Sequence, residues 1–180
     1  MYDIIFDVGH YPPPKDTGAY NSNLDIREHN WSDMLAKACH YYSRINGLFS
    51  SRLVYRKTTL PELCQKINSL NPKFVVSFHL NAYHNSRATG TETWYWHTSS
   101  RSMKNAHIMQ RHTVDVLKLT DRGAKPTSRL FQLGPATRAS IVLIEPGFLT
   151  NNNDMKVLQD KFQLLFEAIC KACVEILEEM

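Results

Sequence analysis

The sequence predicts an α/β fold: a single domain with a mainly parallel, twisted sheet flanked by helices. Short apolar segments alternate along the 180 residues with longer segments whose apolar positions recur at helical spacing, and this alternation is typical of βαβ units. Residues 74–78 and 140–144 are almost continuously apolar, as expected of strands buried on both faces of a parallel sheet. A chain of this length is typical of one domain rather than two.

The predicted elements follow from apolar spacing and from breaker residues. In chain order we expect strands at 2–8, 51–56, 73–79, 90–96, 128–133 and 140–145, and helices at 24–46, 60–70, 102–118 and 154–178. Ser22 or Asn23 is the expected N-cap of the first helix, and Asn46–Gly47 is its expected stop. Residues 12–14 are consecutive prolines, so the segment before this helix is predicted to be a loop.

The last predicted helix is apolar over most of its surface, so it either packs against the sheet or lies on a membrane. Its polar residues form one mostly acidic stripe, made of Gln163, Glu167, Lys171, Glu175 and Glu178. A membrane-lying helix is usually basic on its polar face, so packing in the core is expected. Cys170 and Cys173 form a Cys-x-x-Cys without a second pair nearby, and we interpret them as core residues rather than a zinc or redox motif.

Composition and charge exclude several classes of protein. The net charge of +4 is mild and the basic residues are scattered, so no nucleic-acid partner is expected. The chain has no run of about 18 apolar residues, so membrane insertion is not expected. Its first ten residues contain Asp3 and no basic segment, so we expect no signal peptide and a location in the cytoplasm of the producing cell. A monomer is the favoured oligomeric state.

Three predicted strands end in side chains that bind metals or transfer protons: His10, His79 and Glu145. The carboxyl ends of parallel strands meet at one edge of a sheet, where ligands bind in α/β proteins. The helix that follows the first strand begins at this same edge, and Glu28 lies in its first turns. We therefore expect these four side chains to surround one crevice.

Two histidines and one glutamate form a recurrent catalytic zinc set. Zinc polarises a carbonyl group and lowers the pKa of its bound water. Glu145 precedes a Pro-Gly pair and projects from a rigid strand end, which suits a general base. Two alternatives remain open at this point. His29 is a possible ligand in place of Glu28, and Glu145 is a possible ion-pair partner of Arg138.

Six motifs together resemble one known family. They are "DVGH", "DTGA", a glutamate in the first helix, "SFHLNA", "GTE" and "IEPGFLTN". The pattern extends from Asp7 to Asn152 and resembles the zinc-dependent N-acetylmuramoyl-L-alanine amidases. More narrowly, it is similar to the branch found in bacterial cell-separation amidases and in bacteriophage endolysins.

The resemblance implies a Zn²⁺ cofactor held by His10, Glu28 and His79, with Glu145 as the catalytic carboxylate. It also implies hydrolysis of the amide between N-acetylmuramic acid and L-alanine of peptidoglycan. The segment "DRGAK" is similar to the family's Arg-Gly segment near the substrate cleft. Its Arg122 and Lys125 are therefore candidates for binding the substrate. Glu92 in "GTE", which matches a family position near the site, and Asn81 in "SFHLNA" are further candidates.

The first motif departs from the family pattern, which usually reads Asp-Pro-Gly-His-Gly-Gly. Here Val8 replaces the proline, and the residues Tyr11 to Pro14 replace the glycines. We expect a stiffer loop before Glu28 and a changed fit to the substrate, with the set of metal ligands preserved.

The resemblance and the expected lack of a signal peptide together suggest a bacteriophage endolysin for host lysis. Residues 1–180 would form its amidase catalytic domain, without a separate cell-wall-binding domain, and it would act on the wall after release. Two other functions stay open. One is a zinc peptidase that cuts within peptidoglycan stem peptides, and the other is a catalytically inactive peptidoglycan-binding module. The presence of all four candidate site residues argues against the inactive module.

Overall fold

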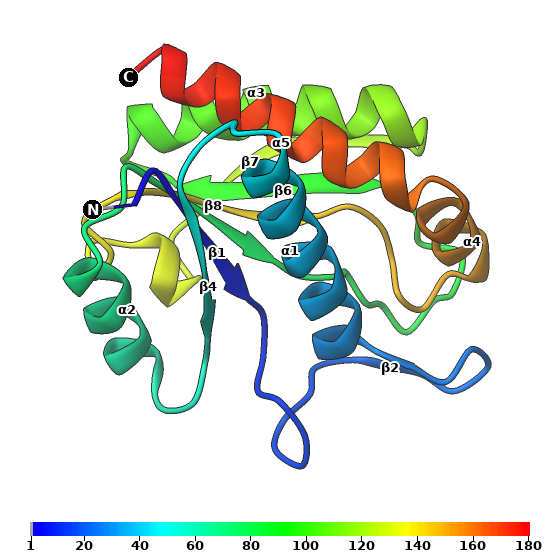
Figure 1. The fold of residues 1–180 in the computed structure, drawn as a ribbon. Helices are drawn as coiled ribbons and strands as arrows, with labels where there is room; N and C mark the ends of the chain where they lie inside the picture. The colour runs from blue at the N-terminus through cyan, green and yellow to red at the C-terminus, as the bar shows by residue number, and fades with distance from the viewer. Residues whose placement is uncertain (1) are drawn as a thin grey trace.

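Six strands form one twisted sheet, in the order β4–β1–β5–β8–β6–β7 (Figure 1). This is a computed structural model of the chain, which describes residues 2–180. The strands are β1 (Ile4–Val8), β4 (Ser51–Tyr55), β5 (Phe74–Phe78), β6 (Thr91–Trp96), β7 (Asp121–Thr127) and β8 (Ser140–Glu145). Strands β4, β1, β5 and β8 are parallel, whereas β6 is antiparallel to β8 and β7 is parallel to β6. The predicted α/β fold with a mainly parallel sheet is confirmed.

Helices cover both faces of the sheet (Figure 1). One face packs against α1 (Glu28–Ile45), α3 (Ser100–Leu117) and α5 (Phe162–Glu178), and the other against α2 (Leu60–Ser69) and the short 3₁₀ helix η1 (Phe131–Leu133). The remaining elements are the hairpin strands β2 (Tyr20–Asn21) and β3 (Ile26–Arg27), and the helix α4 (Asn152–Asp160).

The two layers of helices explain why the central strands are so apolar. In β1, Ile4, Phe6 and Val8 belong to the core under α1 and α5, and Ile5 belongs to the smaller core under α2. All four side chains are completely buried. Burying a side chain of this size contributes about 1.5–3 kcal/mol, so the double-sided burial holds the strand ends rigidly in place.

The register of the strands brings their carboxyl ends to a common edge. Val8 is paired with Phe78, and Phe78 with Ile144, across three neighbouring parallel strands. The residues that follow these positions therefore emerge next to one another, as the sequence predicted for the candidate site.

The first long helix begins at Glu28, four residues later than predicted, and neither Ser22 nor Asn23 caps it. The intervening residues form the β2–β3 hairpin. In its turn, Asn21 Oδ1 accepts hydrogen bonds from the backbone N–H groups of Asn23 (3.0 Å) and Leu24 (3.2 Å). The apolar spacing continued through this turn, which is why the helix was predicted to start too early.

The strand predicted at 128–133 is wrong. Phe131–Leu133 form a 3₁₀ turn, and the edge strand is β7, seven residues from Asp121. Gly123 and Pro126 lie within β7, and both residue types are depleted in strands, so the pattern did not reveal it. Proline is tolerated in β7 because it lies at the edge of the sheet, where one side needs no ladder hydrogen bonds.

The predicted last helix is divided into α4 and α5 at Lys161. This residue leaves the helical conformation, with φ −109° and ψ 18°, and its Nζ donates to the carbonyls of Val116 (2.9 Å) and Leu117 (3.0 Å) at the end of α3. The predicted core role of α5 is confirmed, because Cys170 and Cys173 are free thiols that are fully buried. Within residues 2–180, no helix combines the length and apolar character needed to cross a membrane.

A buried carboxylate at the start of α4 fixes the loop that follows β8. Asp154 is fully buried, and it accepts hydrogen bonds from Thr89 Oγ1 (2.5 Å) and from the backbone N–H groups of Gly90 (3.1 Å) and Phe148 (2.9 Å). Asn151 caps the same helix by accepting from the N–H groups of Asn153 and Asp154. These contacts connect α4 to the segments just before β6 and just after β8.

Replacing Asp154 by alanine should therefore destabilise the protein strongly. Two backbone N–H groups and one hydroxyl would lose their buried acceptor, and each such loss costs roughly 1–3 kcal/mol. We expect Asp154→Ala to lower the free energy of unfolding in urea by about 3 kcal/mol or more. Asp160→Ala, at the exposed end of the same helix, is the matched control and should change it by less than about 0.5 kcal/mol. Equal effects of the two substitutions would contradict this account.

Candidate metal and catalytic site

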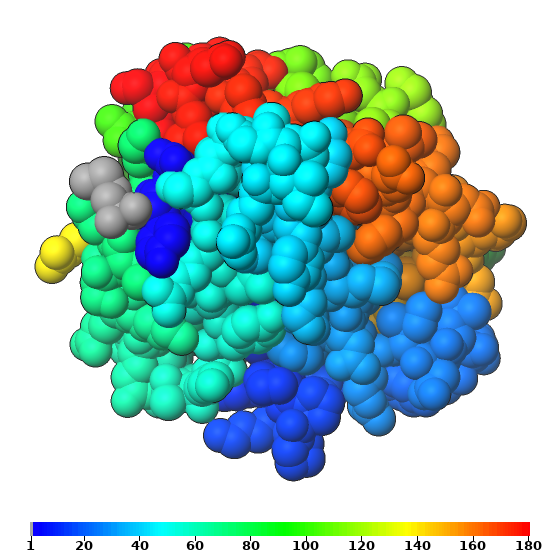
Figure 2. All heavy atoms as spheres, in the orientation of Figure 1, coloured from blue at the N-terminus to red at the C-terminus, as the bar shows by residue number. Residues whose placement is uncertain are grey.

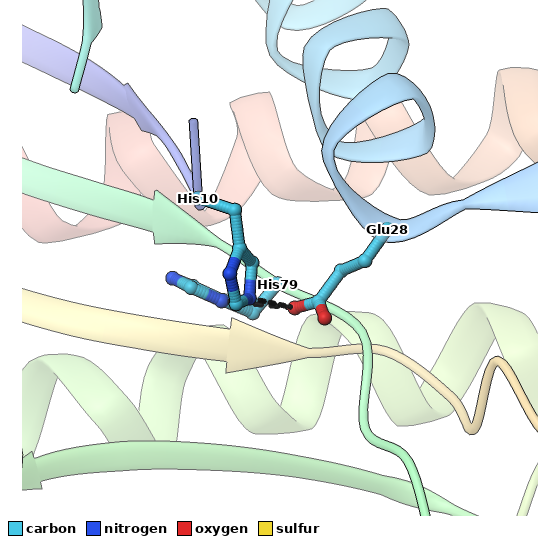
Figure 3. A group of neighbouring side chains, drawn as sticks. All are labelled: His10, Glu28 and His79. Carbon is cyan, nitrogen blue, oxygen red and sulfur yellow. Dashed lines mark hydrogen bonds and ion pairs between the residues drawn. The ribbon is translucent and has the colours of Figure 1, made fainter. Parts of the chain in front are cut away.

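His10, Glu28 and His79 meet at the carboxyl edge of the sheet, each from a different element (Figure 3). His10 Nε2 and His79 Nδ1 each lie 3.0 Å from Glu28 Oε1. One ligand atom from each residue lies within 4.8 Å of the other two, and this is the one group with such geometry in the described part of the chain. The three predicted ligands are therefore brought together, and their binding of a metal stays a prediction.

Two glycines allow this close approach. A Cβ on Gly9 would lie 2.7 Å from the His79 ring, and a Cβ on Gly18 would lie 2.6 Å from both Glu28 Oε2 and the His10 ring. Gly18 also has a positive φ of 75°. His10 itself has φ 61°, an uncommon left-handed conformation for a non-glycine residue. The chain leaves the β1 direction at this residue, where its ring faces Glu28.

Glu28 is held by backbone as well as by the histidines. It is 4% exposed; its Oε2 accepts from the N–H of Ala19 (3.0 Å) and its Oε1 from the N–H of Leu80 (3.2 Å). Burial opposes ionisation, but the hydrogen bonds from His10 and His79 outweigh it and keep the pKa of Glu28 well below its ordinary value. The residue is thus a charged carboxylate in a fixed orientation, as a metal ligand must be.

His79 and Asn81 are fixed by an extension of the β5–β8 ladder. The N–H of His79 donates to the carbonyl of Ile144 (3.0 Å), and the N–H of Asn81 donates to that of Gly147 (3.0 Å). In return, the N–H of Leu149 donates to the carbonyl of Asn81 (2.7 Å). Both side chains therefore project from backbone that is hydrogen-bonded to β8 and the segment after it, rather than from a free loop.

His29 does not join the cluster. Its Nδ1 lies 2.8 Å from the carbonyl oxygen of Gly9, which can only accept, so this nitrogen carries the proton. The residue is buried, at 4% exposed. Of the two adjacent residues, Glu28 is therefore the one whose donor atom meets the two histidines, and His29 supports the backbone next to His10.

Glu145 lies in the same cleft and has a distinct environment. Its Oε2 accepts hydrogen bonds from Trp94 Nε1 (2.9 Å) and Asn81 Nδ2 (3.0 Å). The carboxyl group of Glu92 also lies within hydrogen-bonding reach of Glu145. The alternative pairing with Arg138 is not formed, because Arg138 lies before the opposite end of β8 and contacts Asn68 there.

The surroundings of Glu145 favour its neutral form. Burial raises the pKa of Glu145 to about 8, against the opposing hydrogen bond from Trp94, and the adjacent carboxylates of Glu92 and Glu28 raise it further. Glu92 is its direct cross-strand partner on β6. A carboxyl group with a pKa in this range is suited to accepting and releasing protons near neutral pH.

Glu92 is buried at 2% exposed and connects the site to the cations of β7. Its Oε2 accepts from Arg122 Nε (2.5 Å) and Lys125 Nζ (2.6 Å), and its Oε1 accepts from Asn81 Nδ2 (2.7 Å). Burial opposes its ionisation, but Lys125 and Arg122 outweigh it and lower the pKa of Glu92. One amide group of Asn81 thus bridges Glu92 and Glu145. Direct substrate contact by these four candidates stays a prediction.

The cleft that contains the site has a volume of about 360 Å³. Its polar side is formed by His10, Glu28, His79 and Glu145. Its other walls include five leucines, namely Leu60, Leu63, Leu80, Leu130 and Leu143. The arrangement offers a metal-binding cluster, a proton-transfer carboxylate and an apolar wall within one space.

Two residues of the site were missed by reasoning from the sequence. Trp94 lies two positions after Glu92 on β6, so the two side chains share a face of the sheet. That alternation was the available signal, but the antiparallel pairing of β6 with β8 could not be foreseen. Arg56 lines the cleft from the segment after β4 and belongs to none of the motifs that carried the resemblance.

Comparison with known proteins supports the fold and identifies the family of the chain. A family model described as "Amidase_3: N-acetylmuramoyl-L-alanine amidase" matches residues 4–175. The chain is similar to the N-acetylmuramoyl-L-alanine amidase LytC of Bacillus subtilis (strain 168), with 30% identity over 166 residues. This match includes 87% of the chain and 31% of LytC, so the chain spans about a third of the length of that relative.

Solved structures show the same architecture. An N-acetylmuramoyl-L-alanine amidase from Clostridium difficile 630 has a TM-score of 0.85 and 25% identity, over 98% of this chain and 97% of that one. The catalytic domain of CwlV from Bacillus (Paenibacillus) polymyxa var. colistinus has a TM-score of 0.84 and 25% identity, over 99% of both chains. The catalytic domain of the CD27L endolysin shares the fold, with a TM-score of 0.80 and 24% identity over 99% and 98% of the chains. This chain therefore belongs to the N-acetylmuramoyl-L-alanine amidase family.

Proposed function

We propose that the protein is a zinc-dependent N-acetylmuramoyl-L-alanine amidase that cleaves the amide between N-acetylmuramic acid and L-alanine of peptidoglycan. The observation that carries this proposal is the His10–Glu28–His79 cluster, which shares one cleft with Glu145. Membership of the amidase family supports the bond that is cleaved. The geometry supports a hydrolytic reaction that needs both a metal and a proton-transfer group.

The donor set fits zinc. Two imidazole nitrogens and one carboxylate oxygen converge on a point that is shielded but not closed, since the side chains of His10 and His79 are 25% and 15% exposed. Three protein ligands with a remaining open position are typical of catalytic zinc sites. When bound, zinc would supply a Lewis acid for the scissile carbonyl and a nucleophilic water near neutral pH.

Glu145 would act as the proton-transfer residue of this reaction. Trp94 and Asn81 fix the orientation of its carboxyl group, which would accept a proton from the attacking water and deliver it to the leaving nitrogen. A cation bound by the neighbouring histidines would favour the charged form of Glu145. Its pKa would then fall from the raised value towards neutrality, where a general base is most effective.

We also propose an endolysin role, in which the protein acts on the bacterial wall after release from the cytoplasm of the producing cell. The resemblance of the sequence motifs to the branch that includes bacteriophage endolysins supports this role. The mild positive charge of +4 is compatible with an anionic wall polymer as the surface that the enzyme approaches.

Zinc binding is tested by substituting one ligand at a time. Glu28→Ala and His79→Ala should each reduce zinc content from about one ion per chain to near none, because catalytic zinc sites use three protein ligands. Metal content after dialysis, determined by inductively coupled plasma mass spectrometry, is the measurement. His84→Ala, at an exposed histidine outside the cluster, should leave zinc content unchanged. Full zinc content in Glu28→Ala would exclude this ligand set.

The reaction is tested by product analysis of purified peptidoglycan digested with zinc-loaded protein. Mass spectrometry should detect free stem peptides that begin with L-alanine. Glu145→Gln should keep zinc but react roughly 10²–10⁴-fold more slowly, as expected on loss of a general base. Peptides cut within the stem would instead indicate a zinc peptidase, and no cleavage by the zinc-loaded wild type would indicate a binding module.

The raised pKa of Glu145 predicts an effect on stability in metal-free protein. The folded state keeps the proton up to about pH 8, whereas the unfolded chain releases it near 4.5, so stability is lost as the pH rises through this window. Glutamine does not titrate, so the variant's free energy of unfolding lacks this loss. The free energy of unfolding of Glu145→Gln, relative to that of wild type, should therefore rise by roughly 1–3 kcal/mol from pH 5 to pH 8. Urea unfolding with chelator present measures the difference. An equal difference at the two pH values would show that the pKa is not raised.

A further inference from the structure

The loop that departs from the family pattern is attached to the rim of the cleft. It projects at the lower edge of the molecule, coloured blue (Figures 1 and 2). The Tyr11 hydroxyl donates to the carbonyl of Thr58 (2.6 Å), just before α2. The guanidinium of Arg56 lies 4.3 Å from the centre of the Tyr11 ring, and Arg56 Nε donates to the same carbonyl at 3.3 Å. One aromatic ring and one carbonyl oxygen thus fix the orientation of Arg56.

Arg56 is the cation that the cleft leaves available. It lines the same space as the His10–Glu28–His79 cluster and Glu145. No carboxylate lies within 4.0 Å of it in the described residues. By contrast, Arg122 and Lys125 both pair with Glu92. Arg56 is half-buried, so its charge is partly desolvated and is available to a ligand in the cleft.

The free hydrogen-bond donors of Arg56 suit a single carboxylate group of a ligand. The Tyr11 ring covers one face of its guanidinium group, and the carbonyl of Thr58 accepts from its Nε, so the terminal N–H groups remain to bind an anion. A guanidinium edge binds a carboxylate through two parallel hydrogen bonds. A dianionic phosphate is disfavoured, because the cleft already contains the carboxylates of Glu28 and Glu145.

We propose that Arg56, oriented by Tyr11, is a binding site for a free carboxylate of the stem peptide close to the scissile amide. The enzyme then prefers stems in which this carboxyl group is free over stems in which it is amidated. This inference rests on the proposed peptidoglycan amidase function and specifies its substrate. A glycine at position 11, as in the family pattern, would provide no ring for Arg56, so the preference depends on the sequence of this loop.

The test uses two soluble muramoyl peptides that differ only at the residue after L-alanine, whose carboxyl group is either free or a carboxamide. Wild type should hydrolyse the free acid with a kcat/KM about 10–100-fold higher than that for the carboxamide. This factor corresponds to the free energy of a hydrogen bond to a charged group. Arg56→Gln should lose rate on the free acid alone, so that the two substrates become equivalent. Arg56→Lys, which keeps the charge, should retain part of the preference.

Arg52→Gln is the matched control. Arg52 lies on β4, four residues before Arg56, stacks over Tyr2 at 5.6 Å and donates to its hydroxyl at 3.2 Å, but it does not line the cleft. Its substitution should leave the substrate preference unchanged. Equal losses of rate on both peptides in Arg56→Gln would show that Arg56 acts only on the fold, and would overturn the proposal.

Measuring the binding of the two peptides, separately from their hydrolysis, distinguishes failure of this inference from failure of the proposed function. Calorimetry on Glu145→Gln should show tighter binding of the free acid, and Arg56→Gln in the same background should remove the difference. If wild type hydrolyses neither peptide but binding still discriminates between them, the amidase proposal fails and the carboxylate site stands. Equal binding of the two peptides to Glu145→Gln would overturn the carboxylate site.

Discussion

The carboxylate of Glu28 connects the start of α1 to three other segments of the chain. It contacts His10 after β1, the backbone of Ala19 before the hairpin, and both His79 and the backbone of Leu80 after β5. A carboxylate that is this deeply buried is tolerated only when nearly all of its hydrogen-bonding capacity is used. The edge of the parallel sheet, the hairpin that delays the start of α1 and the two close-packed glycines all serve to meet that requirement.

The surroundings of two carboxyl groups in the site shift their pKa values in opposite directions. Glu28 is kept charged by the histidines, and Glu145 is pushed towards its neutral form by burial and by the neighbouring acidic groups. Carboxylates whose environments move their pKa values apart are a common sign of divided roles in catalysis. Glu92 pairs with the cations of β7 and is connected to Glu145 through Asn81. Arg56 is thus the cation available to the cleft.

The sequence predicted the sheet and the convergence at its edge because both follow from local patterns. Apolar runs located β1, β5 and β8, and parallel topology alone brings His10, His79 and Glu145 to one edge. It did not predict β7, since Gly123 and Pro126 conceal that strand. It also did not predict the contacts of Arg56 with the loop before the hairpin. These depend on how two segments about 45 residues apart lie in space, which no local pattern encodes.

The central claim is that Glu28 and two histidines share one zinc ion, and X-ray absorption spectroscopy at the zinc edge tests it most directly. The zinc-loaded protein should show two imidazole nitrogens and otherwise oxygen ligands, at roughly 2.0–2.2 Å. Glu28→Gln should weaken or abolish this signal. Sulfur scattering near roughly 2.3 Å, or a third imidazole in the wild type, would contradict the account.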